Sequence, residues 1–281
     1  MRRGLLRALK TRPGRLLAAP YIVWMALFTV IPLLLVVWFS FTTPEGGFSF
    51  DNFSQLLGYG AYFGRSFWLA ALSTVICLVI GYPLAYAMSR ETGAMRNTAM
   101  LLLMLPMWIN MLLRTYAWMS ILENRGLLNQ LLSFLRLPTL HIINTPAAVA
   151  VGMVYNYLPF MVLPILTVIQ KIDKSVVEAA QDLGGNQLTV FKRVVLPLSL
   201  PGVLSGITMV FVPGVSTFII SQTLGGGNSK MLGELIEMQF LGGTYNPYLG
   251  SAISLVMMVI VLISMAVMNR FGEGEEEVMV L

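Results

Sequence analysis

The sequence has 281 residues, of which 57% are hydrophobic and only 11% carry a charge, and its net charge is +5. Soluble domains carry about 25% charged residues, so this composition excludes an ordinary water-soluble fold and indicates a membrane protein. The single cysteine, Cys77, and the single histidine, His141, exclude an internal disulfide and a zinc site of the usual Cys/His type.

Six long apolar segments are predicted to cross the membrane. In chain order they are 21–41, 66–88, 99–122, 147–170, 201–221 and 249–268. About 20 apolar residues span the ~30 Å hydrocarbon core as a helix, whereas barrel strands give shorter alternating segments. The sequence therefore predicts an all-α integral membrane protein. Its transmembrane domain, 21–268, lies between an N-terminal tail, 1–20, and a C-terminal tail, 269–281.

Lysine and arginine residues are distributed unequally between the two sides that these spans define. One side, which includes both tails, holds 13 of them, and the opposite side holds only Arg65, Arg125, Arg136 and Lys230. The positive-inside rule then places both termini in the cytoplasm. The first apolar segment is too long for a cleaved signal peptide and lacks a cleavage site, so we expect it to be retained. The basic residues flank apolar segments instead of forming a stripe with aromatics, so no nucleic-acid partner is expected.

Neutral polar and aromatic residues inside the predicted spans are candidates to line a solute path. They are Trp108, Asn110, Tyr155, Asn156, Tyr157, Ser216 and Thr217. Each could instead form a helix–helix hydrogen bond or anchor a span at the interface. Arg114 is the only charged residue within the predicted spans. A charge there is a functional candidate by default, but Arg114 could also brace carbonyls, support an outer gate or snorkel outward, and we favour such a structural role.

The connection between the fourth and fifth spans, 171–199, is too polar to enter the membrane. Ser175 and Glu178 have the spacing of a capping box, so a helix is expected to begin near Ser175. Gly184 or Gly185 can adopt the left-handed conformation that ends it. A second short helix is expected over 187–195, with Pro197 marking the turn into the fifth span. Glu178 and Asp182 would share a face open to a partner, although Glu178 could also be only a cap residue.

This connection resembles the EAA loop of ABC-importer permeases. The match consists of Glu178-Ala179-Ala180, then Gly184, then Val194-x-Leu196-Pro197, where the family prefers isoleucine in place of Val194. The resemblance implies that a coupling helix docks in a groove of a cytoplasmic ATPase subunit and carries its motion to the spans. The coupling residues that it implies are Glu178, Ala179, Ala180, Asp182, Gly184, Leu196 and Pro197.

Further segments are similar to the spermidine/putrescine transport permeases and extend the resemblance over about 66–268. They are 113–118, 126–129, 158–164, 196–202 and 224–226. The resemblance implies a polyamine path in a bacterial inner membrane, shared with a second homologous permease subunit. An extracytoplasmic binding protein would deliver the polyamine, and two ATPase subunits would bind ATP and Mg²⁺. The chain lacks a Gly-x-x-x-x-Gly-Lys-Ser/Thr loop, so we expect no catalytic, cofactor-binding or metal-binding residues in it.

Three alternative functions remain to be compared with this one. Another small solute is possible because the spans contain no Asp or Glu that would bind a cation. A secondary transporter usually has mid-membrane ionisable residues and inverted repeats, which we do not find. An intramembrane enzyme needs a nucleophile with a base, which these spans cannot supply. Glu123, Glu234 and Glu237 lie outside the spans, where they could attract cations, bind a delivery protein or simply be solvated.

Overall fold

A computed structural model describes residues 12–276, so residues 1–11 of the predicted N-terminal tail and 277–281 of the C-terminal tail lie outside the described residues. The described chain is built from helices, and its only bridge between extended segments joins Thr42 and Phe48. The all-α prediction is confirmed. The elements are α2 (Arg12–Met25), η1 (Ala26–Val30), α3 (Ile31–Ser40), α4 (Asp51–Gln55), η2 (Leu56–Tyr59), α5 (Gly60–Arg90), α6 (Gly93–Trp108), α7 (Met111–Leu122), α8 (Leu127–Phe134), α9 (Pro146–Ile169), α10 (Lys174–Asp182), α11 (Gln187–Val190), η3 (Phe191–Val195), α12 (Leu196–Ser216), α13 (Ile219–Leu224), α14 (Leu232–Leu241) and α15 (Pro247–Glu276).

Five helical segments within residues 12–276 are long and apolar enough to cross a membrane. They are Ala19–Ser40, Asp51–Arg90, Pro146–Ile169, Gln187–Ser216 and Pro247–Met268. A sixth is obtained if the bent pair formed by α6 and α7–α8 counts as one span. These helices follow the predicted segments closely except at two of them, the third and the fifth.

The third predicted span, 99–122, is not one continuous helix. The chain turns by 95° between α6 and the segment that begins with α7. Ile109 and Asn110 adopt extended conformations, and the Asn110 side chain accepts a hydrogen bond of 2.8 Å from the Leu112 backbone N–H. Asn110 is thus the N-cap of a new helix, which satisfies an N–H group that the break would leave unpaired. Arg114 consequently lies near the start of α7 and not deep in a continuous span.

The fifth predicted span, 201–221, differs at both ends. Pro197 does not mark a turn, because one helical segment runs from Gln187 to Ser216. A wide π-helical turn, η3, stands directly before Leu196-Pro197, just as η1 stands directly before Ile31-Pro32. Proline lacks an N–H and its ring collides with the preceding helical turn, so the wider turn accommodates it without breaking the helix. The segment ends at Ser216, and Thr217 and Phe218 separate it from α13.

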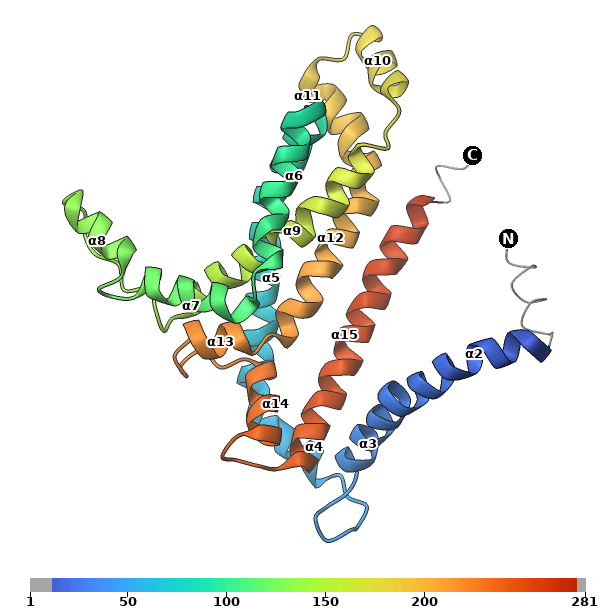
Figure 1. Cartoon of the computed structure of the whole chain (residues 1–281), viewed down its shortest axis with the longest axis vertical. Helices are drawn as coiled ribbons and strands as arrows, with labels where there is room; N and C mark the ends of the chain where they lie inside the picture. Colours follow the sequence, from blue (N-terminus) through green and yellow to red (C-terminus); the bar gives the residue numbers. More distant parts are fainter. Residues whose placement is uncertain (1–11, 277–281) are drawn as a thin grey trace.

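The buried core lies where α5, α9 and α12 pack together (Figure 1). Glycines allow this close approach: a Cβ on Gly202 would lie 2.9 Å from the Pro164 carbonyl oxygen, and one on Gly206 would lie 2.7 Å from Met161 Sδ. Small residues at helix contacts are the usual means of tight packing in membranes. A buried hydrogen bond of 2.7 Å between Tyr82 Oη and Ser199 Oγ also joins α5 to α12.

The first span stands apart from this core. Figure 1 shows α2 leaning away from the bundle, whereas α3 packs against α15. No residue in its most apolar stretch is buried by the rest of the chain. The side chains of this stretch therefore do not pack into the core that α5, α9 and α12 form.

Candidate coupling loop and solute path

Helix α10 begins with a side-chain cap, although not the predicted one. The Asp173 carboxylate accepts a hydrogen bond of 3.0 Å from the Ser175 backbone N–H. Asp173 is therefore the N-cap, and Ser175 already lies inside the helix. The predicted capping box between Ser175 and Glu178 does not form, because the acceptor two residues upstream takes its place.

The end of α10 agrees with the prediction. Gly184 has a φ of +84°, and its N–H donates to the Gln181 carbonyl at 2.8 Å, while the Gly185 N–H donates to the Ala180 carbonyl at 3.1 Å. This pair of bonds is the Schellman arrangement that closes a helix. A Cβ on Gly185 would lie 2.5 Å from the Ala180 carbonyl oxygen. Gly184 is therefore required for its positive φ, and Gly185 is required because a side chain there would collide with the helix.

Helix α10 projects from one end of the molecule (Figure 1). Glu178, Ala179 and Asp182 are exposed, Ala180 is half-buried, and Leu183 just beyond the helix is 90% exposed. The next helix, α11, also begins with a side-chain cap, because the Asn186 side chain accepts a hydrogen bond of 2.8 Å from the Thr189 N–H. Since α11, η3 and α12 are continuous, α10 is attached to a helix that reaches the break at Thr217. Leu196 and Pro197 belong to this long helix and not to α10.

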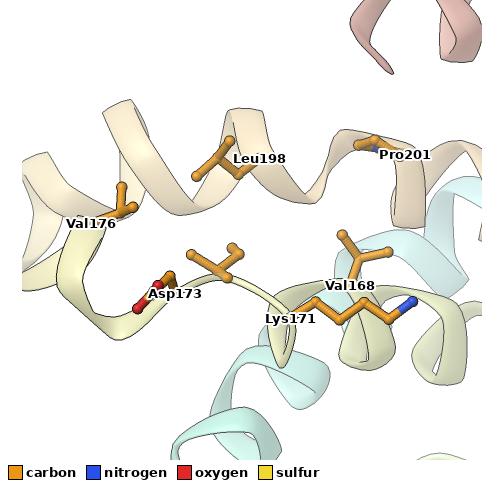
Figure 2. A pocket seen from close by; sticks show the side chains of 7 residues that line it. Val168, Lys171, Asp173, Val176, Leu198 and Pro201 are labelled. Carbon is orange, nitrogen blue, oxygen red and sulfur yellow. The ribbon is translucent and has the colours of Figure 1, made fainter. Parts of the chain in front are cut away.

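Cavities lie beside α10. One of about 360 Å³ separates its start from α12, and Figure 2 shows the apolar side chains of Val168, Val176 and Leu198 around this space. Another of about 650 Å³ is lined by Glu178, Lys174, Arg90 and Arg96, among others. These spaces separate parts of α10 from α12 and from the adjoining ends of α5 and α6, while Val177 and Ala180 of α10 pack against the core.

The Asp173 cap gives a testable pH dependence. The hydrogen bond from the Ser175 N–H holds the pKa of the Asp173 carboxyl below its ordinary value. A lowered folded-state pKa means that the cap stabilises α10 above the ordinary aspartate range, and that this stabilisation is lost as the pH falls through the lowered pKa. We expect Asp173→Ala to speed amide hydrogen exchange in α10 several-fold at pH 7. Asp173→Asn, which also caps, should keep α10 protected, and its protection factor, the intrinsic exchange rate divided by the observed rate, should not fall at low pH. Equal protection factors in the Ala and Asn variants would contradict the cap.

At the other end of the helices, two breaks approach each other. The break at Ile109–Asn110 starts α7, the break at Thr217–Phe218 starts α13, and α7 and α13 are in contact. Tyr155 on α9 meets Trp118 on α7 edge to face, with ring centroids 5.3 Å apart. At this end of the bundle, α7 and α13 form a layer of short helices that lies across the longer ones (Figure 1). We call α7 and α13, together with the break at Thr217–Phe218, the closing layer.

The predicted path residues separate into buried and exposed groups. Asn156 is buried and donates to the Gly152 carbonyl at 2.8 Å, and Tyr157 is buried and donates to the Pro213 carbonyl at 3.4 Å. Thr217 is also buried, whereas Ser216 is exposed and bonded to its own helix. Trp108 and Asn110 are exposed at the α6–α7 break. The hydrogen bond of Asn156 lies within α9, and that of Tyr157 joins α9 to α12.

Arg114 is half-buried beside this group. Its Nε and Nη1 atoms are buried and have no hydrogen-bond partner among the described residues. Tyr157 is close enough to both Arg114 and Thr217 to interact with them electrostatically. Buried N–H donors without acceptors are costly. The closing layer therefore contains unsatisfied N–H donors of Arg114, close to the Tyr157 side chain that also interacts with Thr217.

Glu234, on α14, is not a solvated charge as one interpretation of the sequence suggested. It is only 4% exposed, while Glu123 is exposed and Glu237 is half-buried. Burial raises the pKa of the Glu234 carboxyl, and Ser221 and Lys230 offset this only in part. This burial has no local signal in the sequence, because it depends on α14 packing against segments that include the distant α5.

Comparisons with known proteins agree with this architecture. The family model described as "Binding-protein-dependent transport system inner membrane component" matches residues 78–274. The chain is 35% identical over 247 residues to the spermidine/putrescine transport system permease protein PotB of Escherichia coli (strain K12), covering 84% of this chain and 90% of that protein. It is 36% identical over 258 residues to PotB of Haemophilus influenzae, covering 88% and 90%.

Solved structures show the same fold at lower sequence similarity. A bacterial ABC transporter involved in the import of the acidic polysaccharide alginate has a chain that superposes with a TM-score of 0.80 at 18% identity, covering 96% of this chain and 98% of that one. A chain of the MetNI methionine ABC transporter gives a TM-score of 0.59 at 15% identity, covering 79% and 97%. At these identities the likeness concerns the fold alone.

Proposed function

Because the chain belongs to the family of binding-protein-dependent transport system inner membrane components, we propose that it forms half of the membrane path of an ATP-driven polyamine importer. Members of this family are multi-pass transport permeases of the inner membrane and not enzymes. The observation that carries the polyamine assignment is the 35% identity to a spermidine/putrescine permease over most of both chains. The other half of the path would come from a second, homologous permease subunit.

The driving step would begin at α10. Two ATPase subunits would bind ATP and Mg²⁺ in place of this chain, and one of them would dock on Glu178, Ala179, Ala180, Asp182 and the Schellman turn at Gly184. The exposed face of α10 and its projection from one end of the molecule favour this role (Figure 1). The 30-residue segment Gln187–Ser216, which includes Leu196 and Pro197, would then act as a rigid lever about 45 Å long. Its far end is the break next to α7.

The closing layer would act as the outer gate. With α10 in the cytoplasm, as the positive-inside rule requires, α7 and α13 lie toward the extracytoplasmic side, where a binding protein delivers the solute. Both chain termini would then be cytoplasmic. Rotation of α12 would shift Thr217 against Tyr157 and Arg114, and Arg114 would brace the layer when it is closed. Trp108, Asn110, Tyr155, Asn156 and Ser216 would line the path or support the side chains that do.

The test is uptake by the assembled transporter. Proteoliposomes that contain the chain with its partner permease and ATPase subunits should import labelled spermidine and putrescine when ATP is inside and loaded binding protein is outside. A non-hydrolysable ATP analogue is the matched control and should give no uptake. ATP-dependent import of an anionic or neutral solute, with none of either polyamine, would overturn the polyamine assignment and leave the permease assignment standing.

A further inference from the structure

Helix α14 is fixed against the break that begins α13. A Cβ on Gly233 would lie 2.2 Å from the Ser216 carbonyl oxygen and 2.7 Å from that of Thr217. The start of α14 is also attached to α5, because the Leu232 N–H donates to Ser66 Oγ at 2.7 Å. Figure 1 shows α14 beyond α13, toward the end of the molecule formed by α4. Glu234, the residue after Gly233, is thus held at the outer side of the closing layer.

The Glu234 carboxylate lacks the partners that a buried acid needs. Its Oε2 atom has no hydrogen-bond partner among the described residues. Ser221 lies beside it, but the Ser221 hydroxyl donates its proton to the Phe218 carbonyl at 3.0 Å. Lys230 also lies near, yet its Nζ contacts Met238 Sδ at 3.5 Å. The fold therefore contains a buried acceptor that its own donors leave unsatisfied, which ordinarily destabilises a protein.

Two further features lie near this carboxylate. The backbone carbonyls of Ser216 and Thr217, at the break, face Gly233, the residue before Glu234. Glu237, one helical turn along α14, adds a second negative charge whose repulsion acts on Glu234. A group that brings positive charge and several N–H donors would satisfy the Glu234 carboxylate and suit these acceptors. A primary ammonium has both properties.

We infer that Glu234 binds an ammonium group of the polyamine at the outer end of the path, beside the Thr217–Phe218 break. The inference rests on the proposed function and adds a carboxylate to a path whose spans contain none. The unsatisfied carboxylate is costly in the empty protein and is stabilised when the cation arrives. Such a site binds the solute only as the layer opens, because Glu234 is buried while the layer is closed.

Glu234→Gln tests the site in the assembled transporter, since glutamine keeps the shape and removes the charge. We expect the empty variant complex to unfold at a higher temperature than wild type, because the buried charge is gone. Free spermidine should raise the unfolding temperature of the wild-type complex but not of the variant. Uptake should fall about tenfold or more while ATP hydrolysis stimulated by the binding protein persists. Glu123→Gln, at an exposed glutamate, is the matched control and should behave as wild type.

The outcomes separate this inference from the proposed function. Wild-type uptake together with an unchanged spermidine shift in Glu234→Gln would overturn the role of Glu234 and leave the importer assignment intact. A Glu234→Gln complex that unfolds at a lower temperature and loses ATP hydrolysis and uptake together would show a structural role, and would also overturn it. Absence of polyamine uptake by the wild-type complex would instead contradict the proposed function.

Discussion

Replacing Gly184 by proline should abolish both solute uptake and the ATP hydrolysis that loaded binding protein stimulates. Gly184 has a φ of +84°, whereas proline is restricted to about −65°. Its N–H donates to the Gln181 carbonyl at 2.8 Å, and proline has no N–H to donate. The Schellman turn would therefore open, and α10 would lose its fixed orientation relative to α12. Reconstituted transporter, assayed for both activities, is the appropriate measurement.

A matched substitution at the same position separates conformation from side-chain loss. No atom lies within 4 Å of a Cβ placed on Gly184, and asparagine tolerates the left-handed conformation. Gly184→Asn should therefore retain most of both activities. Glu178→Lys, which reverses an exposed charge on α10, should assemble in the membrane but lose both uptake and the ATP hydrolysis that loaded binding protein stimulates. Full activity in both Gly184→Pro and Glu178→Lys would contradict the coupling role of α10.

Replacing Gly233 by alanine should strongly destabilise the closing layer. The added Cβ would lie 2.2 Å from the Ser216 carbonyl oxygen, which is backbone and cannot turn aside as a flexible side chain would. Overpacking of this kind costs about 1–3 kcal/mol or more. We expect the thermal midpoint of the purified protein in detergent to fall by roughly 5–10 °C. Uptake should fall with it, because α14 can no longer rest against the α12–α13 break.

Gly243→Ala provides the control for this prediction. A Cβ at Gly243 has no atom within 4 Å, so the same chemical change meets open space just beyond the end of α14. Its thermal midpoint should match that of the unsubstituted protein within about 2 °C. Equal midpoints for Gly233→Ala and Gly243→Ala would show that α14 can move away from the break without cost.

The spans and the coupling loop could be predicted because both have local signals. A span needs only about 20 apolar residues, and the loop combines a polar segment with glycines and a family motif. The caps were less certain, since Asp173 and Ser175 are both good capping residues two positions apart. In the folded protein Asp173 is the residue that caps α10. The assignment of coupling roles to Glu178 and its neighbours stays a prediction.

The helix breaks and the burial of Glu234 could not be predicted in this way. Each break has only one or two neutral polar residues, Asn110 in one and Ser216 and Thr217 in the other, and such residues also occur inside continuous spans. Prolines are no guide either, because Pro159, Pro164 and Pro201 lie inside unbroken helices. Asn110 was considered as a path residue and not as a helix cap. Glu234 is buried by α14 packing against segments that are distant in the sequence, and such contacts leave no periodic pattern in the chain.

The isolation of the first span has a consequence for how the protein is made. A helix in lipid satisfies its own backbone hydrogen bonds, and the Ala19–Ser40 segment has a mean hydropathy of 2.6. None of its most apolar residues needs this chain's core for cover. During synthesis it can therefore leave the translocation machinery as a finished unit, whereas α5 gains its packing contacts only once α9 and α12 have followed. We expect a nascent chain that ends before α5 to integrate stably, and one that ends after α5 to depend on further synthesis.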